Sequence, residues 1–375
     1  MKLTDLRTPC VLVDYARMSQ NLQRMQSAAD ARGLRLRPHA KTHKSVVMAQ
    51  RQIADGAVGI CCAKLGEAEV LADGSVDDIR LPYPLNPING DRVIELLERA
   101  RISFIVDHAD VAAGWSEVMK AAGRTVDVLV KVDVGFHRCG IDPDAANAAD
   151  FVVRVAELPG LRFRGLLSHA GHGYGATSEA EVEAIARTEA AIMATLADRV
   201  RERGVEVPEI SVGATPTARY SLQQEGLTEL RPGNYIYYDR TQVALGAAGW
   251  DDCALTVLAR VVAKPAADRI ILDSGSKTLT NDLARGFSPM PGHGAVLTSV
   301  EDVQSPDDDL VIERLSEEHA TLRVRSGGHR LEPGDLVRIV PNHACVVSNL
   351  VEAGWMVDGT EVLEPLHIAA RGRIT

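Results

Sequence analysis

Val126-Asp127-Val128-Leu129-Val130 is a largely apolar run without strict alternation of polar and apolar side chains. A half-buried strand alternates, so this run predicts a strand buried on both faces, as in a parallel sheet. Short strand patterns of this kind alternate with helical patterns through the first 240 residues. The number of these units predicts an α/β protein with a (β/α)8 barrel of TIM type. An open, doubly wound sheet is the competing interpretation.

The expected elements of this first region follow from the apolar periodicity. Strands are predicted at 10–14, 34–38, 58–63, 78–83, 102–106, 126–134, 161–169, 209–213 and 229–235. Helices are predicted at 16–31, 46–53, 66–72, 90–100, 109–122, 145–156 and 179–204.

After residue 239 the helical periodicity nearly disappears, and strand patterns separated by turn signals take over. Strands are expected at 255–262, 268–272, 295–300, 310–315, 320–324, 335–340, 345–350 and 367–370. We therefore predict a barrel domain at 13–240 and a smaller, mostly-β domain at 241–375. The sequence pattern does not decide whether residues 1–12 pack on the second domain.

The composition excludes several classes of protein. The chain has 375 residues, of which 46% are hydrophobic and 25% are charged, as in an ordinary soluble protein. A net charge of −10 argues against nucleic acid as a partner. No apolar run is long enough to span a bilayer, and the N-terminus lacks the apolar core of a signal peptide. The six scattered cysteines predict free thiols in a reducing cytoplasm.

The segment Arg37-Pro38-His39-Ala40-Lys41-Thr42-His43-Lys44 lies between a predicted strand and a predicted helix. A lysine at such a junction is a candidate amine nucleophile that can form a Schiff base with a carbonyl cofactor. The neighbouring basic residues are expected to lower the pKa of Lys41, because a nearby positive charge disfavours the ammonium form. The alternative interpretation is a solvated basic loop.

Barrel enzymes place their active sites at the carboxyl ends of the strands, so residues just after each strand deserve inspection. Arg138 follows the strand at 126–134. His169, His172 and Tyr174 follow the strand that starts at residue 161 and alternate with glycines, which let a backbone approach a ligand closely. This arrangement favours a binding site over histidines that serve as structural hydrogen-bonding groups.

Two glycine-containing turns follow the late strands. Gly213 and Thr215 lie in the first turn, and Gly233 and Asn234 lie in the second. Exposed backbone N–H groups in such turns can bind a phosphate, and the Thr215 hydroxyl adds a donor. We expect this phosphate site to face the strand-end Lys41 from the opposite side of the barrel. Ordinary turn chemistry is the alternative.

A candidate metal site follows the strand at 335–340. If the chain stays extended there, His343 and Cys345 point to the same side, because residues two apart in a strand share a face. An imidazole and a thiolate suit zinc or a similar divalent ion, and two protein ligands leave positions open for water and substrate. The alternative is a core cysteine beside a surface histidine.

Taken in order, these segments resemble the D-threonine aldolase / D-serine dehydratase-like family, metal-assisted pyridoxal-phosphate enzymes with the alanine racemase fold. The resemblance runs nearly end to end, from Thr8 to Gly372. Its marks are Arg37-Pro38-His39-Ala40-Lys41-Thr42-His43-Lys44, Val132-Asp133-Val134-Gly135, Gly171-His172-Gly173-Tyr174-Gly175, Gly213-Ala214-Thr215-Pro216, Arg231-Pro232-Gly233-Asn234-Tyr235 and Pro341-Asn342-His343-Ala344-Cys345.

The resemblance implies a role for each matched residue. Lys41 would carry pyridoxal 5'-phosphate, with Arg138 near its phenolic oxygen and His169 beside its ring. The remaining implied cofactor-binding residues are Tyr174, Gly213, Thr215, Gly233, Asn234 and Tyr235. His343 and Cys345 would bind a divalent ion, namely zinc, manganese, cobalt or magnesium. Family members are typically homodimers.

The implied activity is cleavage of D-3-hydroxy amino acids such as D-threonine to glycine and an aldehyde, with Lys41 and His169 as the catalytic residues. The alternative is dehydration of D-serine or D-3-hydroxyaspartate to a 2-oxo acid and ammonia, with Lys41 taking the Cα proton. A non-catalytic protein that binds pyridoxal phosphate is an alternative of another class. A racemase would need a tyrosine from the β-domain, and no tyrosine follows Tyr238.

Overall fold

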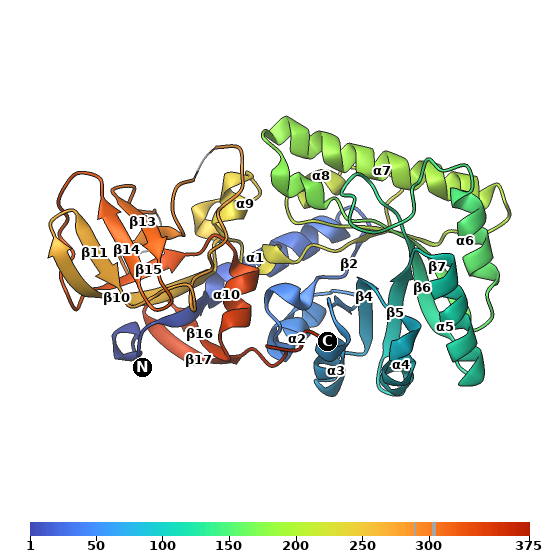
Figure 1. Ribbon diagram of the computed structural model, residues 1–375, viewed down its shortest axis with the longest axis horizontal. Helices are drawn as coiled ribbons and strands as arrows, with labels where there is room; N and C mark the ends of the chain where they lie inside the picture. The colour runs from blue at the N-terminus through green and yellow to red at the C-terminus, as the bar shows by residue number, and fades with distance from the viewer. Residues whose placement is uncertain (289, 302–304) are drawn as a thin grey trace.

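The computed structural model describes residues 1–288, 290–301 and 305–375. Figure 1 shows two parts side by side, a parallel sheet surrounded by helices and a second region built mainly of strands. Helix α10 lies between them in this view.

The first part is a closed ring of parallel strands in the order β2-β9-β8-β7-β6-β5-β4-β3. The ends of this order meet, because the N–H of Val58 donates to the Leu36 carbonyl at 2.9 Å and that of Cys61 to the Pro38 carbonyl at 2.7 Å. The predicted (β/α)8 barrel is therefore confirmed, and the open sheet is wrong. The strands are β2 (Arg35–Leu36), β3 (Ile60–Cys61), β4 (Asp78–Pro84), β5 (Arg101–Val106), β6 (Val126–Lys131), β7 (Leu161–Leu167), β8 (Glu209–Val212) and β9 (Glu229–Leu230).

Helices cover the outside of the ring. Strand β6 is buried along its whole length, as its unbroken apolar pattern predicts. Helix α7 turns Val182, Ala186, Ala190 and Met193 inward at spacings of three or four residues. The helices of this part are α1 (Tyr15–Asp30), α2 (Val46–Ala54), α3 (Leu65–Asp73), α4 (Gly90–Leu97), α5 (Ala109–Ala121), α6 (Ala148–Glu157), α7 (Glu179–Arg201) and α8 (Ala218–Ser221).

The second part is a mostly antiparallel sheet built around β10 (Leu255–Ala266), which pairs with β1 (Cys10–Asp14), β11 (Arg269–Leu272) and β15 (Leu336–Val340). The first strand of the chain thus belongs to this sheet, and the domain bounds of 13–240 and 241–375 stay a prediction. The other strands are β12 (Ala295–Leu297), β13 (Leu310–Leu315), β14 (Ala320–Val324), β16 (Ala353–Asp358) and β17 (Glu361–His367).

Short helices make most of the remaining connections. They are η1 (Leu3–Asp5), η2 (Ala40–Thr42), η3 (Pro87–Asn89), η4 (Gly171–Gly175), η5 (Asn234–Ile236), α9 (Arg240–Ala244), η6 (Trp250–Asp252) and α10 (Ala344–Leu350).

Two of the strands expected near the C-terminus are wrong. Residues 345–350 form helix α10, although Val346 and Val347 favour a strand. The buried carboxylate of Asp239 accepts the N–H of Ala344 at 2.9 Å, and this tertiary contact satisfies a free donor of the first turn. The expected strand at 367–370 is also wrong, because residues 353–358 and 361–367 pair as β16 and β17 instead.

The barrel interior contains a set of paired charges that we call the barrel ion-pair layer: Arg37, Arg80, Glu209 and Glu229. Glu209 and Glu229 open β8 and β9, so the layer lies toward the amino ends of these strands. Arg37 Nε lies 2.9 Å from Glu229 Oε2, and Arg80 Nη2 lies 2.8 Å from Glu209 Oε2. All four side chains are buried.

Candidate active site

A cavity of about 700 Å³ lies at the carboxyl ends of the barrel strands and is also lined by segments of the second sheet region. It contains most of the residues that the sequence singled out. They are Lys41, Arg138, His169, Tyr174, Thr215, Gly233, Asn234, His343 and Cys345. The catalytic and binding roles assigned to them stay predictions.

Lys41 lies in η2, directly after β2, and exposes its side chain to the cavity. The surrounding protein displaces this amine from bulk water, which lowers its pKa. The charges of Arg138 and Arg231 lower the pKa further, while the negative charge of Cys345 opposes the shift. An accessible amine with a lowered pKa is the species that adds to a carbonyl group.

The predicted cause of this pKa shift is wrong in part. His43 turns away from the cavity, with Nε2 3.2 Å from Gln52 Oε1, and Lys44 forms an ion pair with Glu67 at 3.0 Å. Neither residue is a free positive charge beside Lys41. The cations that act on Lys41 come from other strands, which adjacency in the sequence did not reveal.

His169 follows β7 and has a defined orientation. Its Nδ1 is hydrogen-bonded to the Gly213 carbonyl, so Nδ1 carries the proton and Nε2 keeps its lone pair. Burial lowers the pKa of His169 well below its ordinary value, and the charges of Lys41 and Lys131 add to this effect. His169 is therefore a neutral imidazole with one nitrogen free to accept a proton.

The two glycine turns form one end of the cavity. The backbone N–H groups of Thr215 and Gly233 donate to no oxygen within the described part of the chain. Thr215 Oγ1 accepts the N–H of Asn234 at 3.0 Å, which links the two turns. Free N–H donors at this position fit a phosphate group.

The expected placement of these turns across the barrel from Lys41 is wrong. Strand β9 pairs directly with β2, and β8 follows β9, so both turns are on the same side of the ring as Lys41. The N–H of His39 donates to the Pro232 carbonyl at 3.0 Å, which joins the Lys41 segment to the second turn.

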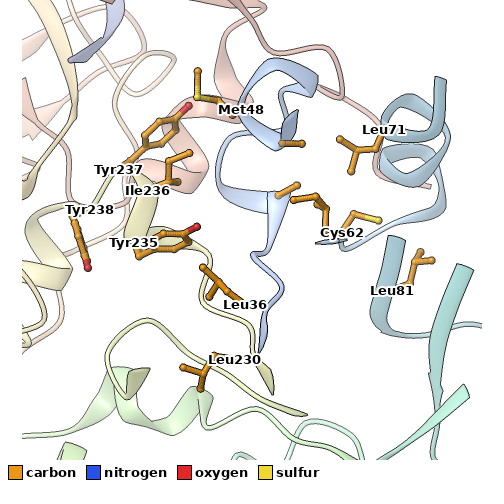
Figure 2. Close-up of a cluster of buried hydrophobic side chains, with 14 of the residues drawn as sticks. Leu36, Met48, Cys62, Leu71, Leu81, Leu230, Tyr235, Ile236, Tyr237 and Tyr238 are labelled. Carbon is orange, nitrogen blue, oxygen red and sulfur yellow. The ribbon is translucent and has the colours of Figure 1, made fainter. Parts of the chain in front are cut away.

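Gly213 and Tyr235 are not among the residues that line the cavity. Gly213 contributes its carbonyl to His169, and a Cβ at this position would lie 2.9 Å from the Arg231 backbone. The Tyr235 hydroxyl accepts a hydrogen bond from Gln52 Nε2 at 3.1 Å. Figure 2 shows Tyr235 among buried side chains near Leu36, and the structure does not support a side-chain contact with a cofactor.

His343 and Cys345 meet in the cavity, although not by the predicted geometry. The chain does not stay extended, because His343 caps helix α10 and Cys345 lies in its first turn. Both side chains line the cavity, and each shifts the pKa of the other. Cys345 Sγ also lies 3.2 Å from Thr42 Oγ1 and 3.6 Å from Asn234 Nδ2, so the pair adjoins both the Lys41 segment and the second glycine turn.

The charges of this pair reinforce each other. Burial opposes protonation of His343, but the hydrogen bond and charge of Cys345 outweigh it and raise the pKa of His343 to about 10. Burial alone would raise the pKa of Cys345, but His343 lowers it. A thiolate beside an imidazole is a suitable donor set for a soft divalent ion. Within residues 1–288, 290–301 and 305–375 no group of three or more His, Cys, Asp or Glu is arranged for metal binding, so the site consists of a pair.

Several cavity residues have no role assigned to them from the sequence. Lys131 ends β6 and Arg231 immediately follows β9, and both were counted inside predicted strands. Arg231 donates to Ser211 Oγ at 2.7 Å and to the Ser168 carbonyl. Asp239 accepts a hydrogen bond from the Asn234 side-chain amide at 2.6 Å. Asp282 also lines the cavity, and it belongs to none of the sequence motifs. Lys131 and Arg231 could have been predicted from their positions at the carboxyl ends of β6 and β9.

Comparison with known proteins gives two family matches. Residues 13–241 match the model for the alanine racemase N-terminal domain, and residues 254–357 match one described as a putative serine dehydratase domain. The chain is 34% identical to a D-threonine aldolase from Arthrobacter sp., over 99% of this chain and 94% of that protein. It is 32% identical to a D-threo-3-hydroxyaspartate dehydratase from Delftia sp., over 92% of each.

Solved structures of a dehydratase and of an aldolase also match this chain. The structure of the Delftia sp. dehydratase matches with a TM-score of 0.90 at 30% identity, covering 98% of this chain and 99% of that one. The D-threonine aldolase from Filomicrobium marinum matches with a TM-score of 0.88 at 30% identity, covering 100% and 98%. The expected fold is confirmed along nearly the whole chain.

Proposed function

Because this chain belongs to the alanine racemase N-terminal domain family, and its full-length relatives are aldolases and dehydratases, we propose that it is a metal-dependent D-threonine aldolase. It is a lyase, as those relatives are. The proposed reaction cleaves D-3-hydroxy amino acids to glycine and an aldehyde with the help of pyridoxal 5'-phosphate. One observation carries the proposal: a single cavity holds Lys41, His169 and the His343–Cys345 pair.

The residues of the cavity fit this cofactor. Lys41 offers an accessible amine of lowered pKa to an aldehyde, and the free N–H groups of Thr215 and Gly233 suit its phosphate. Arg138 lines the same cavity without a carboxylate partner in the described chain, so it can balance further negative charge. When bound, the cofactor supplies an electron sink and the metal ion supplies a Lewis acid.

The chain's own residues then divide the proton transfers. His169 holds its proton on Nδ1 against Gly213, so Nε2 can accept the proton of the substrate's β-hydroxyl as the Cα–Cβ bond breaks. The lowered pKa of His169 keeps the imidazole unprotonated before this step. His343 and Cys345 would hold the ion, and a solved D-threo-3-hydroxyaspartate dehydratase variant described as metal-free supports a metal in this group of proteins.

Dehydration of D-serine or D-3-hydroxyaspartate is the second candidate. The TM-score of 0.90 with the Delftia sp. dehydratase favours it. The lowered pKa of Lys41 also suits it, because a neutral amine can remove a Cα proton. A non-catalytic cofactor carrier has less support, since the second sheet region brings His343 and Cys345 into the same cavity.

One assay separates the two candidates. Protein loaded with pyridoxal phosphate and zinc, manganese, cobalt or magnesium is incubated with D-threonine, D-serine and D-threo-3-hydroxyaspartate in separate reactions. We expect glycine and acetaldehyde from D-threonine as the fastest reaction, and no product from the Lys41→Ala variant. Faster release of a 2-oxo acid and ammonia from either other substrate would replace the aldolase by the dehydratase.

We further propose that the protein acts as a homodimer, as the resemblance to its family implies. We place it in the cytoplasm without nucleic acid or membrane partners, because its cysteines are scattered, its net charge is −10 and its sequence has no apolar run long enough to span a bilayer. None of the helices in the described residues is long and apolar enough to cross a membrane. Analytical ultracentrifugation tests the dimer, and a single species with the mass of one chain would contradict it.

A further inference from the structure

Asp282 makes a direct contact with the proposed metal site. Its Oδ2 lies 2.7 Å from His343 Nδ1, although the two residues are 61 positions apart in the chain. Both side chains line the cavity and remain accessible, with 42% of His343 and 52% of Asp282 exposed. The contact is therefore at the cavity mouth, where a bound ion would be within reach of solvent and substrate.

The loop that carries Asp282 is tied to the His343 segment by a second contact. Asn342 is fully buried, and its Nδ2 donates to the Asp282 carbonyl at 2.9 Å and to the Gly292 carbonyl at 3.0 Å. The Thr241 hydroxyl donates to the Asn342 carbonyl at 2.8 Å. The backbone of Asp282 is thus held beside His343, so its carboxylate reaches the imidazole of His343 without a movement of the loop.

The contact decides which ring nitrogen is available. A carboxylate is only an acceptor, so Nδ1 of His343 must carry a proton toward Asp282. Nε2 is then the nitrogen left for a metal ion. A carboxylate on the outer nitrogen of a ligating histidine orients the ring and increases its basicity.

We propose that Asp282 is a positioning residue for the metal ion, acting through His343 without touching substrate. This inference rests on the proposed metal site at His343 and Cys345. It predicts that the affinity for the ion depends on a residue outside the His343–Cys345 motif.

The test measures the zinc dissociation constant of the cofactor-loaded protein by competition with a chromogenic chelator. We expect Asp282→Ala to weaken zinc binding about 10–100-fold. Asp282→Asn keeps an acceptor for Nδ1 without the charge, so its loss is smaller. Asp91→Ala is the matched control, because it removes an exposed carboxylate at the start of α4, outside the residues that line the cavity. Its zinc affinity should equal that of the wild type.

A purely structural effect would behave differently. If Asp282→Ala only disturbed the loop, excess zinc would not restore turnover, whereas a positioning role predicts near wild-type kcat at saturating zinc. Absorption of the cobalt-loaded variants gives a second readout, because a reoriented imidazole changes the ligand field. An unchanged spectrum and an unchanged dissociation constant in Asp282→Ala would overturn the inference.

His343→Ala separates this failure from failure of the proposed function. If His343→Ala loses zinc while Asp282→Ala binds it as tightly as the wild type, the metal site stands and only the role of Asp282 is rejected. If His343→Ala also binds zinc with wild-type affinity, both the metal site at His343 and Cys345 and the role of Asp282 are rejected.

Discussion

Two sets of basic side chains lie inside the same barrel, and they differ in what faces them. In the barrel ion-pair layer, Arg37 and Arg80 meet carboxylates at 2.9 and 2.8 Å. At the carboxyl ends of the strands, Lys41, Lys131 and Arg138 form no ion pair within 4 Å among the described residues. Both sets belong to one ring of strands. Carboxylates neutralise the arginines of the barrel ion-pair layer, whereas the cations at the cavity have no such partner among the described residues.

The difference separates stability from ligand binding. Paired charges inside a protein offset each other's desolvation cost, and removing one partner leaves an uncompensated charge. Unpaired cations around a cavity instead present positive charge to whatever enters it. The layer should therefore respond to mutation through folding free energy, and the cavity through activity and affinity for anionic ligands.

The largest expected effect is that of Lys41→Ala. Removal of the amine should lower kcat about 10⁴-fold or more and give colourless protein, because no other described residue of the cavity offers an equally accessible amine. Steady-state kinetics and the visible spectrum measure this. Lys120→Ala, on the surface of α5, is the control. A yellow and active Lys41→Ala enzyme would refute the assignment.

Removal of the metal should come next. Prolonged chelation should lower turnover of D-threonine by about 10²–10³-fold, since a Lewis acid contributes several kcal/mol to transition-state stabilisation. The cofactor absorbance should stay, because Lys41 and the glycine turns do not depend on the ion. Zinc, manganese or cobalt should restore activity. Undiminished turnover in excess chelator would exclude the ion from the mechanism.

Glu229→Gln tests the role of the barrel ion-pair layer in stability. It leaves Arg37 and Arg80 without their shared carboxylate and should lower the free energy of unfolding by about 3–5 kcal/mol. Glu313→Gln is the control, because this carboxylate is 53% exposed and lies 3.9 Å from Arg323, so its loss should cost less than about 1 kcal/mol. Urea unfolding measures both. Equal losses in the two variants would contradict the structural role of the layer.

The same carboxylate predicts a dependence of stability on pH. Burial alone would raise the pKa of Glu229, but the charges of Arg80 and Arg37 outweigh it and lower the pKa to about 2. A lowered folded-state pKa stabilises the fold above the ordinary value of 4.5, and this contribution disappears as the pH falls toward 2. It amounts to about 3 kcal/mol. The difference in unfolding free energy between wild type and Glu229→Gln should shrink on acidification, and a constant difference would contradict this origin.

The smallest expected effect is that of Thr215→Val in the cavity. The substitution keeps the shape of the side chain and removes its hydroxyl, which joins the two glycine turns through Asn234. We expect the affinity for pyridoxal phosphate to fall about 5–10-fold, equivalent to roughly 1 kcal/mol for one hydrogen bond. Spectrophotometric titration of the cofactor-free protein measures it. Unchanged affinity would locate the phosphate elsewhere in the cavity.

The sequence predicted the barrel well because its strands are nearly continuous apolar runs, of which β6 is an example. It also predicted cavity residues that follow strands, such as Lys41 and Thr215, since this position alone directs them to one end of a barrel. Cys345 was predicted from a strand that does not exist, and it still faces the cavity because helix α10 begins there.

Other features depend on contacts between distant segments and could not be predicted locally. Helix α10 is held by Asp239, which lies 105 positions away from Ala344. Asp282 meets His343 across 61 positions without any periodic pattern. Tyr235 belongs to a matched motif, but only the fold shows that its hydroxyl turns toward Gln52 and the core.

The attachment of the cofactor to Lys41 is tested most directly by locating the cofactor on the chain. Protein loaded with pyridoxal phosphate is reduced with borohydride, digested and analysed by mass spectrometry. We expect a phosphopyridoxyl group on the peptide that contains Lys41, because this amine is exposed to the cavity, while Lys131 in the same cavity is only 4% exposed. Labelling of Lys131 instead, or an unmodified Lys41 in fully loaded protein, would contradict it.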